Sequence, residues 1–137
     1  IKVIENIDDI EILSYQNELF QVILNLFSNS IDVLSSNEIE DKIIHIKIYH
    51  DENNLYIEFL DNGGGIKDEF INRVFEPYFT TKHKSQGTGV GLYMSLQIVT
   101  KHLNGEISVK NDTFIENNTA YFGAKFTILL PIHLQKN

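Results

Sequence analysis

Cysteine is absent from the 137-residue sequence, which excludes disulfide bonds, thiolate catalysis and cysteine-ligated zinc. The same absence fits a reducing compartment, and we expect the protein to work in the cytoplasm. Long apolar runs are also missing, because none approaches the roughly 20 residues that a membrane helix requires. The sequence therefore predicts no direct contact with a membrane.

Positive charge is scarce as well. Only 11 Lys and Arg residues stand against 19 Asp and Glu residues, which gives a formal net charge of -8, and no stretch forms a basic patch. Nucleic acid would be repelled by this charge. No nucleic-acid partner is therefore expected.

Length and composition predict one domain. A chain of 137 residues, 42% of them hydrophobic, can bury a core without the help of disulfide bonds or a structural metal ion. It is too short for two ordinary domains. We therefore expect a single domain over residues 1–137 that is a monomer on its own. The chain begins at Ile1 and no charged-then-apolar leader follows, which predicts a segment of a longer protein.

Helical periodicity marks three segments. Apolar residues recur at spacings of three and four over 17–34 and again over 91–103, and a short helix is predicted over 67–75. The polar stretch 80–89 is predicted to be a mobile loop. Asn104-Gly105 is predicted to end the last helix through a left-handed conformation.

Strand patterns surround these helices. Residues 1–14 alternate in part and predict one or two short strands. Two antiparallel hairpins are predicted, one from 42–50 and 55–60, the other from 106–114 and 120–130. Together the elements predict an α+β two-layer sandwich, with a mixed, mostly antiparallel sheet covered on one face by about three helices.

Two asparagines form a polar stripe on the long predicted helix. Asn25 and Asn29 are four residues apart and lie on one helical face, with Asp32 nearly in line. Neutral amide oxygens suit Mg²⁺ when substrate phosphates supply most of the ligand charge. The pattern alone also fits exposed asparagines, or buried ones that bond to the backbone.

A glycine run follows the first predicted hairpin. Asp61 stands just past the second strand, and Asn62 separates it from three glycines, Gly63 to Gly65, which permit a sharp turn and close approach of a ligand. A carboxylate there can accept a hydrogen bond from an exocyclic amine, and it would favour adenine over guanine, which presents an oxygen. An ordinary turn is the alternative that these residues leave open.

A second glycine cluster, Gly87-Thr88-Gly89-Val90-Gly91, leads directly into a predicted helix. Free backbone N–H groups and the positive end of the helix dipole can face a phosphate at such a place. The spacing matches neither the dinucleotide fingerprint nor a P-loop. A flexible linker before a helix is the alternative interpretation.

In this order, the three signals resemble the motifs of the histidine-kinase and related ATPase superfamily. Asn25 to Asn29 resembles its N box, Asp61 to Ile66 its first glycine box, and Gly87 to Leu92 its second. Phe75 to Lys82 is similar to the F box of the nitrogen-sensor-like branch. The resemblance runs from about Gln16 to Pro131, nearly the whole chain.

The resemblance implies the Bergerat fold, with ATP and Mg²⁺ held between the helices and the sheet. It places Asn29 and Asn25 on Mg²⁺ and Asp61 on the adenine amine. Lys82, beside the lid over the phosphates, would neutralise charge near the transferred phosphoryl group. The implied nucleotide contacts are Asn25, Asn29, Asp61, Gly63, Gly65, Ile66, Phe79, Thr81, Lys82, Gly87, Thr88, Gly89, Val90, Gly91 and Leu92.

The resemblance also indicates the reaction. Hydrolytic relatives (gyrase, the mismatch-repair ATPase and the heat-shock chaperone) carry glutamate where Asn25 stands, and an amide cannot activate water. An ATP:protein-histidine phosphotransferase domain is implied, whose nucleophile comes from a separate helical hairpin that also dimerises such kinases. A response regulator would be the indirect partner. None of the chain's histidines has the helical phosphoacceptor context: His45, His50, His83, His102 and His133.

The sequence departs from the family pattern after the N box. Many kinases have alanine where Ser30 stands and a basic residue where Asp32 stands, so a basic phosphate contact is missing here. Lys82 or Lys84 would have to replace it. Two other functions therefore stay open: a nucleotide-sensing scaffold that transfers nothing, and a serine kinase of the anti-sigma-factor type. The isolated chain is expected to be nearly inert as a kinase.

Overall fold

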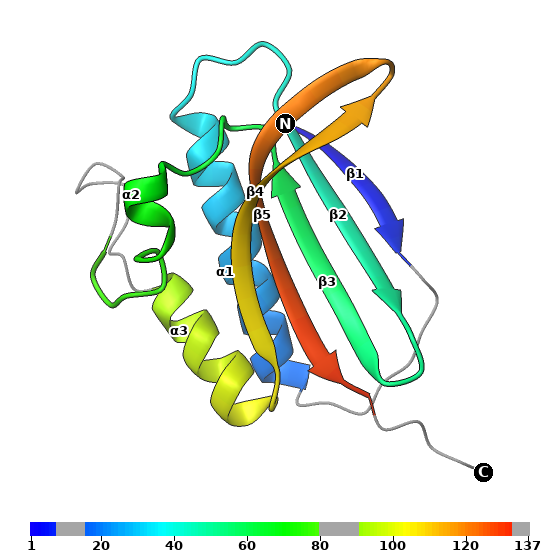
Figure 1. Cartoon of the computed structure of the whole chain (residues 1–137), viewed down its shortest axis with the longest axis vertical. Coiled ribbons are helices and arrows are strands. Elements are labelled where there is room, and N and C mark those ends of the chain that lie inside the picture. The colour runs from blue at the N-terminus through cyan, green and yellow to red at the C-terminus, as the bar shows by residue number, and fades with distance from the viewer. Residues whose placement is uncertain (8–15, 80–90, 133–137) are drawn as a thin grey trace.

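The computed structural model describes residues 1–7, 16–79 and 91–132. Its centre is a five-stranded sheet in the spatial order β1-β2-β3-β5-β4 (Figure 1). The strands are β1 (Lys2–Ile7), β2 (Ile43–His50), β3 (Asn54–Asp61), β4 (Glu106–Glu116) and β5 (Thr119–Pro131). β1 runs parallel to β2, and the other neighbouring pairs are antiparallel. The predicted mixed, mostly antiparallel sheet is confirmed.

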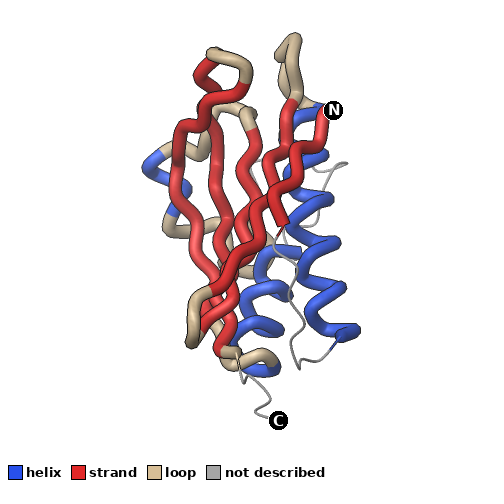
Figure 2. Tube along the Cα trace, turned by 90° about the vertical axis from the view of Figure 1, so that its right-hand side faces the viewer, coloured by secondary structure: helices blue, strands red, loops and turns tan. Residues whose placement is uncertain are grey.

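Helices cover one face of this sheet, as the edge-on view in Figure 2 shows. They are the long α1 (Gln16–Ser35) and α3 (Gly91–Gln97), which continues into the π-helical η1 (Ile98–His102). The one-turn α2 (Asp68–Ile71) lies apart from them, on the left of the strands in Figure 2. The predicted two-layer α+β sandwich is therefore confirmed. No helix within the described ranges is long and apolar enough to cross a membrane.

Strand parity decides which side chains of β3 enter the core. Leu55, Ile57 and Phe59 are each at most 4% exposed, whereas Tyr56 and Glu58 between them are only half-buried. Successive side chains of a strand point to opposite faces, so the buried set shares the face that packs against α1. Asp61, two residues after Phe59, continues this set. The hydrophobic alternation of the strand therefore brings a carboxylate into the interior.

Two predicted boundaries are wrong. The helix predicted over 67–75 is only the single turn α2, and the chain then continues through turns such as Arg73 N–H to Phe70 C=O, at 2.8 Å. Pro77 lacks a backbone N–H and disfavours a helical conformation at Glu76, so no helix could extend past that residue. Asp61 is the last residue of β3 rather than the first residue beyond it.

The predicted turns are confirmed where the structure describes them. Asn104 has φ 54° after η1, and the β4–β5 turn has φ 50° at Asn117 and 63° at Asn118. Asparagine tolerates this left-handed conformation better than most residues. The predicted loop 80–89 and the second part of the predicted strand region, 8–14, lie outside the described residues.

Candidate functional site

Asp61 is a buried carboxylate at the end of β3, with only 1% of its surface exposed. Its Oδ1 accepts hydrogen bonds from the backbone N–H groups of Gly63, at 2.8 Å, and Ala124, at 3.5 Å. Its Oδ2 is buried and accepts no hydrogen bond from any residue that the structure describes. An unsatisfied buried carboxylate oxygen is costly, so this atom fits a ligand that donates a hydrogen bond, such as the amine of adenine.

The charge state of Asp61 reflects the same environment. Burial raises the pKa of its carboxyl above the ordinary value, and the N–H groups of Gly63 and Ala124 oppose that rise only in part. A donor placed on Oδ2 would favour the ionised form. Binding of an amine-bearing ligand should therefore lower the pKa of this carboxyl towards its usual range.

The glycine loop, Gly63–Ile66, lies next to this carboxylate and is held by two asparagine side chains. Asn37, after the end of α1, donates from Nδ2 to the C=O of Gly63 at 3.1 Å. Asn111 of β4 bonds to both backbone groups of Ile66, accepting its N–H and donating to its C=O, each at 2.8 Å. The loop is thus tied to the helix on one side and to the β4–β5 hairpin on the other.

Asn25 connects α1 to the beginning of α3. Its Nδ2 donates to Ser95 Oγ at 3.2 Å and to the C=O of Gly91 at 3.4 Å. Ser95 is fully buried and donates from Oγ to the same Gly91 carbonyl, at 2.9 Å. Asn25 therefore fixes the first turn of α3, at the end of the predicted phosphate loop. Asn29 is partly buried one turn further along α1.

The donor set fits a magnesium ion that arrives with its nucleotide. In the part of the chain that the structure describes, no cluster of three or more His, Asp or Glu side chains could hold a metal ion. Mg²⁺ would therefore take most of its ligand charge from phosphates, and Asn29 and Asn25 would offer amide oxygens. Oδ1 of Asn25 already accepts a hydrogen bond from Gln21 at 2.9 Å, which leaves one lone pair.

The remaining predicted contacts divide into two groups. Phe79 and Leu92 are half-buried, and the ring of Phe79 lies 4.6 Å from the guanidinium carbon of Arg73. The other group lies outside the described residues, so its roles stay predictions: Thr81, Lys82, Gly87, Thr88, Gly89 and Val90. The structure thus brings Asp61 together with Gly63 to Ile66, and Asn25 with Gly91. The roles of all these residues in nucleotide binding stay predictions.

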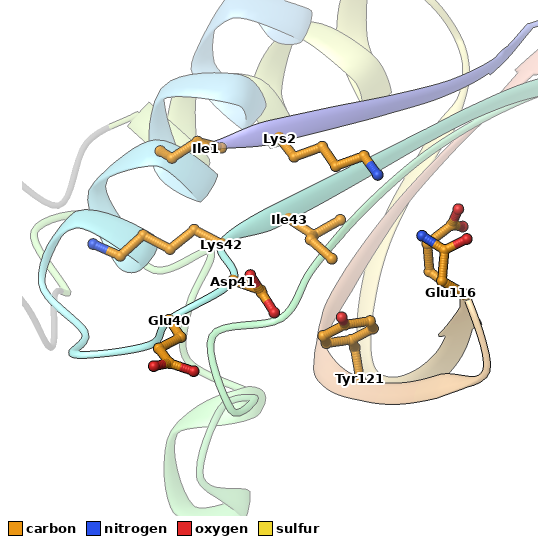
Figure 3. Close-up of a pocket in the computed structure, with 9 residues that line it drawn as sticks. Ile1, Lys2, Glu40, Asp41, Lys42, Ile43, Glu116 and Tyr121 are labelled. Carbon is orange, nitrogen blue, oxygen red and sulfur yellow. The ribbon is translucent and has the colours of Figure 1, made fainter.

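A hollow of about 340 Å³ lies at a different place, between the starts of β1 and β2 and the β4–β5 turn (Figure 3). Charged side chains line most of it, and the ring of Tyr121 stands at its wall. Its lining residues are Ile1, Lys2, Glu40, Asp41, Lys42, Ile43, Glu116, Asn117 and Tyr121. None of them belongs to the predicted nucleotide contacts, so this hollow is not the predicted nucleotide site.

Ser30, next to Asn29, is a second buried polar group without a visible partner. Its side chain is 1% exposed, and its hydroxyl makes no hydrogen bond within the described ranges. Ser30→Ala removes this hydroxyl and introduces a better helix former. We expect the free energy of unfolding, measured with urea, to rise by about 1 kcal/mol. Ser28→Ala, at an exposed position of the same helix, should change it by about half as much or less. A loss of stability in Ser30→Ala would reveal a partner for the hydroxyl.

Four residues of this region were missed by sequence reasoning: Asn37, Ser95, Asn111 and Gly123. A Cβ atom on Gly123 would lie 1.8 Å from the carbonyl oxygen of Asp61, so only glycine lets β5 pass this close to β3. An isolated glycine inside a strand pattern does indicate close backbone approach. Asn37, Ser95 and Asn111 carry no local signal of this kind, because their partners lie far away in the sequence.

Comparison with known proteins identifies the family of this chain. Residues 14–134 match the family model described as histidine kinase-, DNA gyrase B-, and HSP90-like ATPase. Sporulation kinase A of Bacillus subtilis (strain 168) is 37% identical over 114 residues, which cover 83% of this chain and 17% of that protein. The signal transduction histidine-protein kinase AtoS of Escherichia coli (strain K12) is 34% identical over 119 residues, which cover 87% of this chain and 17% of that protein. The chain thus spans less than a fifth of these relatives.

The fold also has solved counterparts. The mycobacterial sensor histidine kinase MprB superposes with a TM-score of 0.76 over 98% of this chain and 83% of that one, at 20% identity. This likeness concerns the fold, whereas the family match covers most of the sequence. The chain therefore belongs to the histidine kinase-, DNA gyrase B- and HSP90-like ATPase family and, within it, to the ATPase domains of sensor histidine kinases.

Proposed function

We propose that this domain binds ATP with Mg²⁺ and presents the γ-phosphoryl group to a histidine on a separate helical domain. Membership of an ATPase family implies ATP binding. The observation that carries the proposal is the buried Oδ2 of Asp61, which has no donor among the described residues. An amine at the adenine position would supply that donor, whereas guanine would place an oxygen against the carboxylate.

The predicted site residues have distinct roles in this proposal. Asp61 accepts the adenine amine, and Gly63 and Gly65 form the floor on which the base rests. Asn29 and Asn25 contribute amide oxygens towards Mg²⁺, which would neutralise phosphate charge when bound. Lys82 compensates charge on the transferred phosphoryl group.

In the proposed reaction, an imidazole nitrogen forms a bond to the γ-phosphorus and the bond from that phosphorus to the β–γ bridging oxygen breaks. The products are phosphohistidine and ADP. Asn25 stands where the hydrolytic relatives carry a glutamate, and an amide cannot take a proton from water. The arrangement therefore favours transfer to a protein nucleophile over hydrolysis of ATP.

We also propose the partners that this reaction requires. The phosphoacceptor histidine would lie on a helical hairpin of the parent protein, which also dimerises it, and a response regulator would receive the phosphoryl group. The present chain would be a single domain that is monomeric alone. ATP is a cytoplasmic nucleotide, so we place the domain in the cytoplasm. The name of the relative AtoS, a signal transduction histidine-protein kinase, supports these partners.

Mixing this chain with the purified helical hairpin of its parent and labelled ATP tests the proposal. We expect acid-labile phosphate on the hairpin, little or no label on this chain alone, and no transfer with Asp61→Asn. Acid-stable phosphate on a protein partner would instead indicate a serine kinase of the anti-sigma-factor type. ATP binding without transfer at high hairpin concentration would indicate a nucleotide-sensing scaffold.

A further inference from the structure

We propose that Asn111 is a positioning residue for nucleotide binding, because its side chain clamps the glycine loop, Gly63–Ile66, in the conformation that aims the Asp61 carboxylate at the base. This inference rests on the proposed function. It assigns a role in the site to a residue of the β4–β5 hairpin, which none of the sequence motifs contains.

The side-chain amide of Asn111 holds the loop through hydrogen bonds to both backbone groups of one residue. Oδ1 of Asn111 accepts the N–H of Ile66, and Nδ2 donates to the C=O of the same residue, both at 2.8 Å. A side-chain amide that engages both backbone groups of one residue replaces the pairing that a neighbouring strand would give. Asn111 is itself half-buried, so water competes only in part for these bonds.

The loop needs such a clamp because of its glycines. Gly64 and Gly65 have φ of 90° and 82°, values that other residues rarely adopt, and glycine loses more conformational freedom on ordering than other residues. A Cβ on Gly65 would lie 2.7 Å from Oδ1 of Asn111 and 2.8 Å from Cε1 of Phe122. The hairpin and the loop are therefore in close contact, and Gly64 N–H also bonds to the Phe122 carbonyl at 3.1 Å.

The glycine loop contacts the Asp61 carboxylate directly, so the position of the loop affects the orientation of that carboxylate. Gly63, the first residue of the loop, donates its N–H to Oδ1 of Asp61 at 2.8 Å. This bond orients the carboxyl group and so decides where the unpaired Oδ2 points. Without Asn111, the three glycines would sample more conformations in the free protein, and a nucleotide would have to order them on binding.

Calorimetric titration of the 137-residue chain with ADP and with GDP tests this inference, using Asn111→Ala and the control Ser108→Ala. Ser108 is an exposed residue of the same strand. We expect Asn111→Ala to weaken ADP binding on the order of tenfold, with a less favourable binding entropy. It should keep the preference for ADP over GDP, because the Asp61 carboxylate still accepts a hydrogen bond from the adenine amine and faces an oxygen in guanine. Ser108→Ala should bind like the unmodified chain.

Hydrogen exchange separates positioning from a general loss of stability. In Asn111→Ala the amide of Ile66 should exchange faster, while amides in the middle of β3 keep their exchange rates. If Asn111→Ala does not fold, Asn111→Asp replaces it, since it keeps the size and the oxygen that accepts the Ile66 N–H. Its second oxygen faces a carbonyl, so a loss of affinity is again expected.

The outcomes separate the two proposals. ADP binding by the variants within twofold of the unmodified chain, with unchanged exchange at Ile66, overturns the role of Asn111. A loss of the ADP preference in Asn111→Ala also overturns it, since a positioning residue does not read the base. No ADP binding by the unmodified chain overturns the proposed function instead. In that case exchange at Ile66 decides whether Asn111 holds the loop at all.

Discussion

Asp61→Asn is expected to weaken ADP binding by about a hundredfold or more, which is the largest functional effect that a single substitution should have here. The variant removes the charge that strengthens a hydrogen bond from an adenine amine. It also replaces one of the two carboxylate oxygens with an NH₂ group. An NH₂ group at the Oδ2 position faces the adenine amine, so two hydrogen-bond donors oppose each other inside a buried site. Calorimetric titration with ADP measures the change.

The control for this variant is Asp41→Asn, which makes the same change of charge at an exposed side chain. Its affinity for ADP should equal that of the unmodified chain. Binding of ADP by Asp61→Asn within fivefold of the unmodified chain would mean that the carboxylate does not contact the base. The adenine site would then have to be placed elsewhere.

The same variant should be more stable than the unmodified chain at neutral pH. Burial raises the pKa of Asp61 in the folded protein. The contribution of this carboxyl to stability is therefore fully present below its unfolded pKa of about 3.9, and it is lost as pH rises through the raised folded pKa. The asparagine in Asp61→Asn does not ionise, so the variant does not lose stability in this way as pH rises. Urea unfolding should therefore show a gain at pH 7 that disappears near pH 4. Lower stability of the variant at pH 7 would contradict this expectation.

Gly123→Ala is expected to destabilise the fold by about 3 kcal/mol, the largest effect on stability. Gly123 is buried in β5, and its Cβ would lie 1.8 Å from the carbonyl oxygen of Asp61 and 2.7 Å from Asp61 Oδ1. Neither neighbour is the flexible end of a long side chain. β3 and β5 would have to separate locally, and the carboxylate would move with them.

Urea unfolding of Gly123→Ala measures this effect, with Gly91→Ala as the matched control. A Cβ on Gly91 meets nothing within 4 Å, and alanine is the better residue in a helix, so stability should be unchanged or slightly higher. Gly123→Ala should also lose affinity for ADP at concentrations where it remains folded. An unchanged unfolding midpoint would show that the two strands can move apart at little cost.

The sequence by itself determined the elements and the order of the motifs. Spacings of three and four along α1, and alternation along β3, are local consequences of helix and strand geometry, so they can be read without a structure. The polar residues of the site interrupt these patterns at Asn25 and Asp61. The interruptions indicate where polar side chains of the candidate site lie, whereas the family was predicted from the resemblance of four motifs, and the match over residues 14–134 confirms it. The role of Asp61 towards adenine stays a prediction.

Only the tertiary structure decided how the site is held. Asn111 bonds to a residue 45 positions earlier, and Gly123 lies against Asp61 through the register of β3 and β5. Such contacts depend on which strands pair and where the hairpin crosses the loop, and no local pattern encodes either. The same packing supplies N–H donors to Oδ1 of Asp61 and, among the described residues, none to Oδ2. The residue type supplied a carboxylate, and the fold leaves one of its oxygens without a hydrogen-bond donor among the described residues.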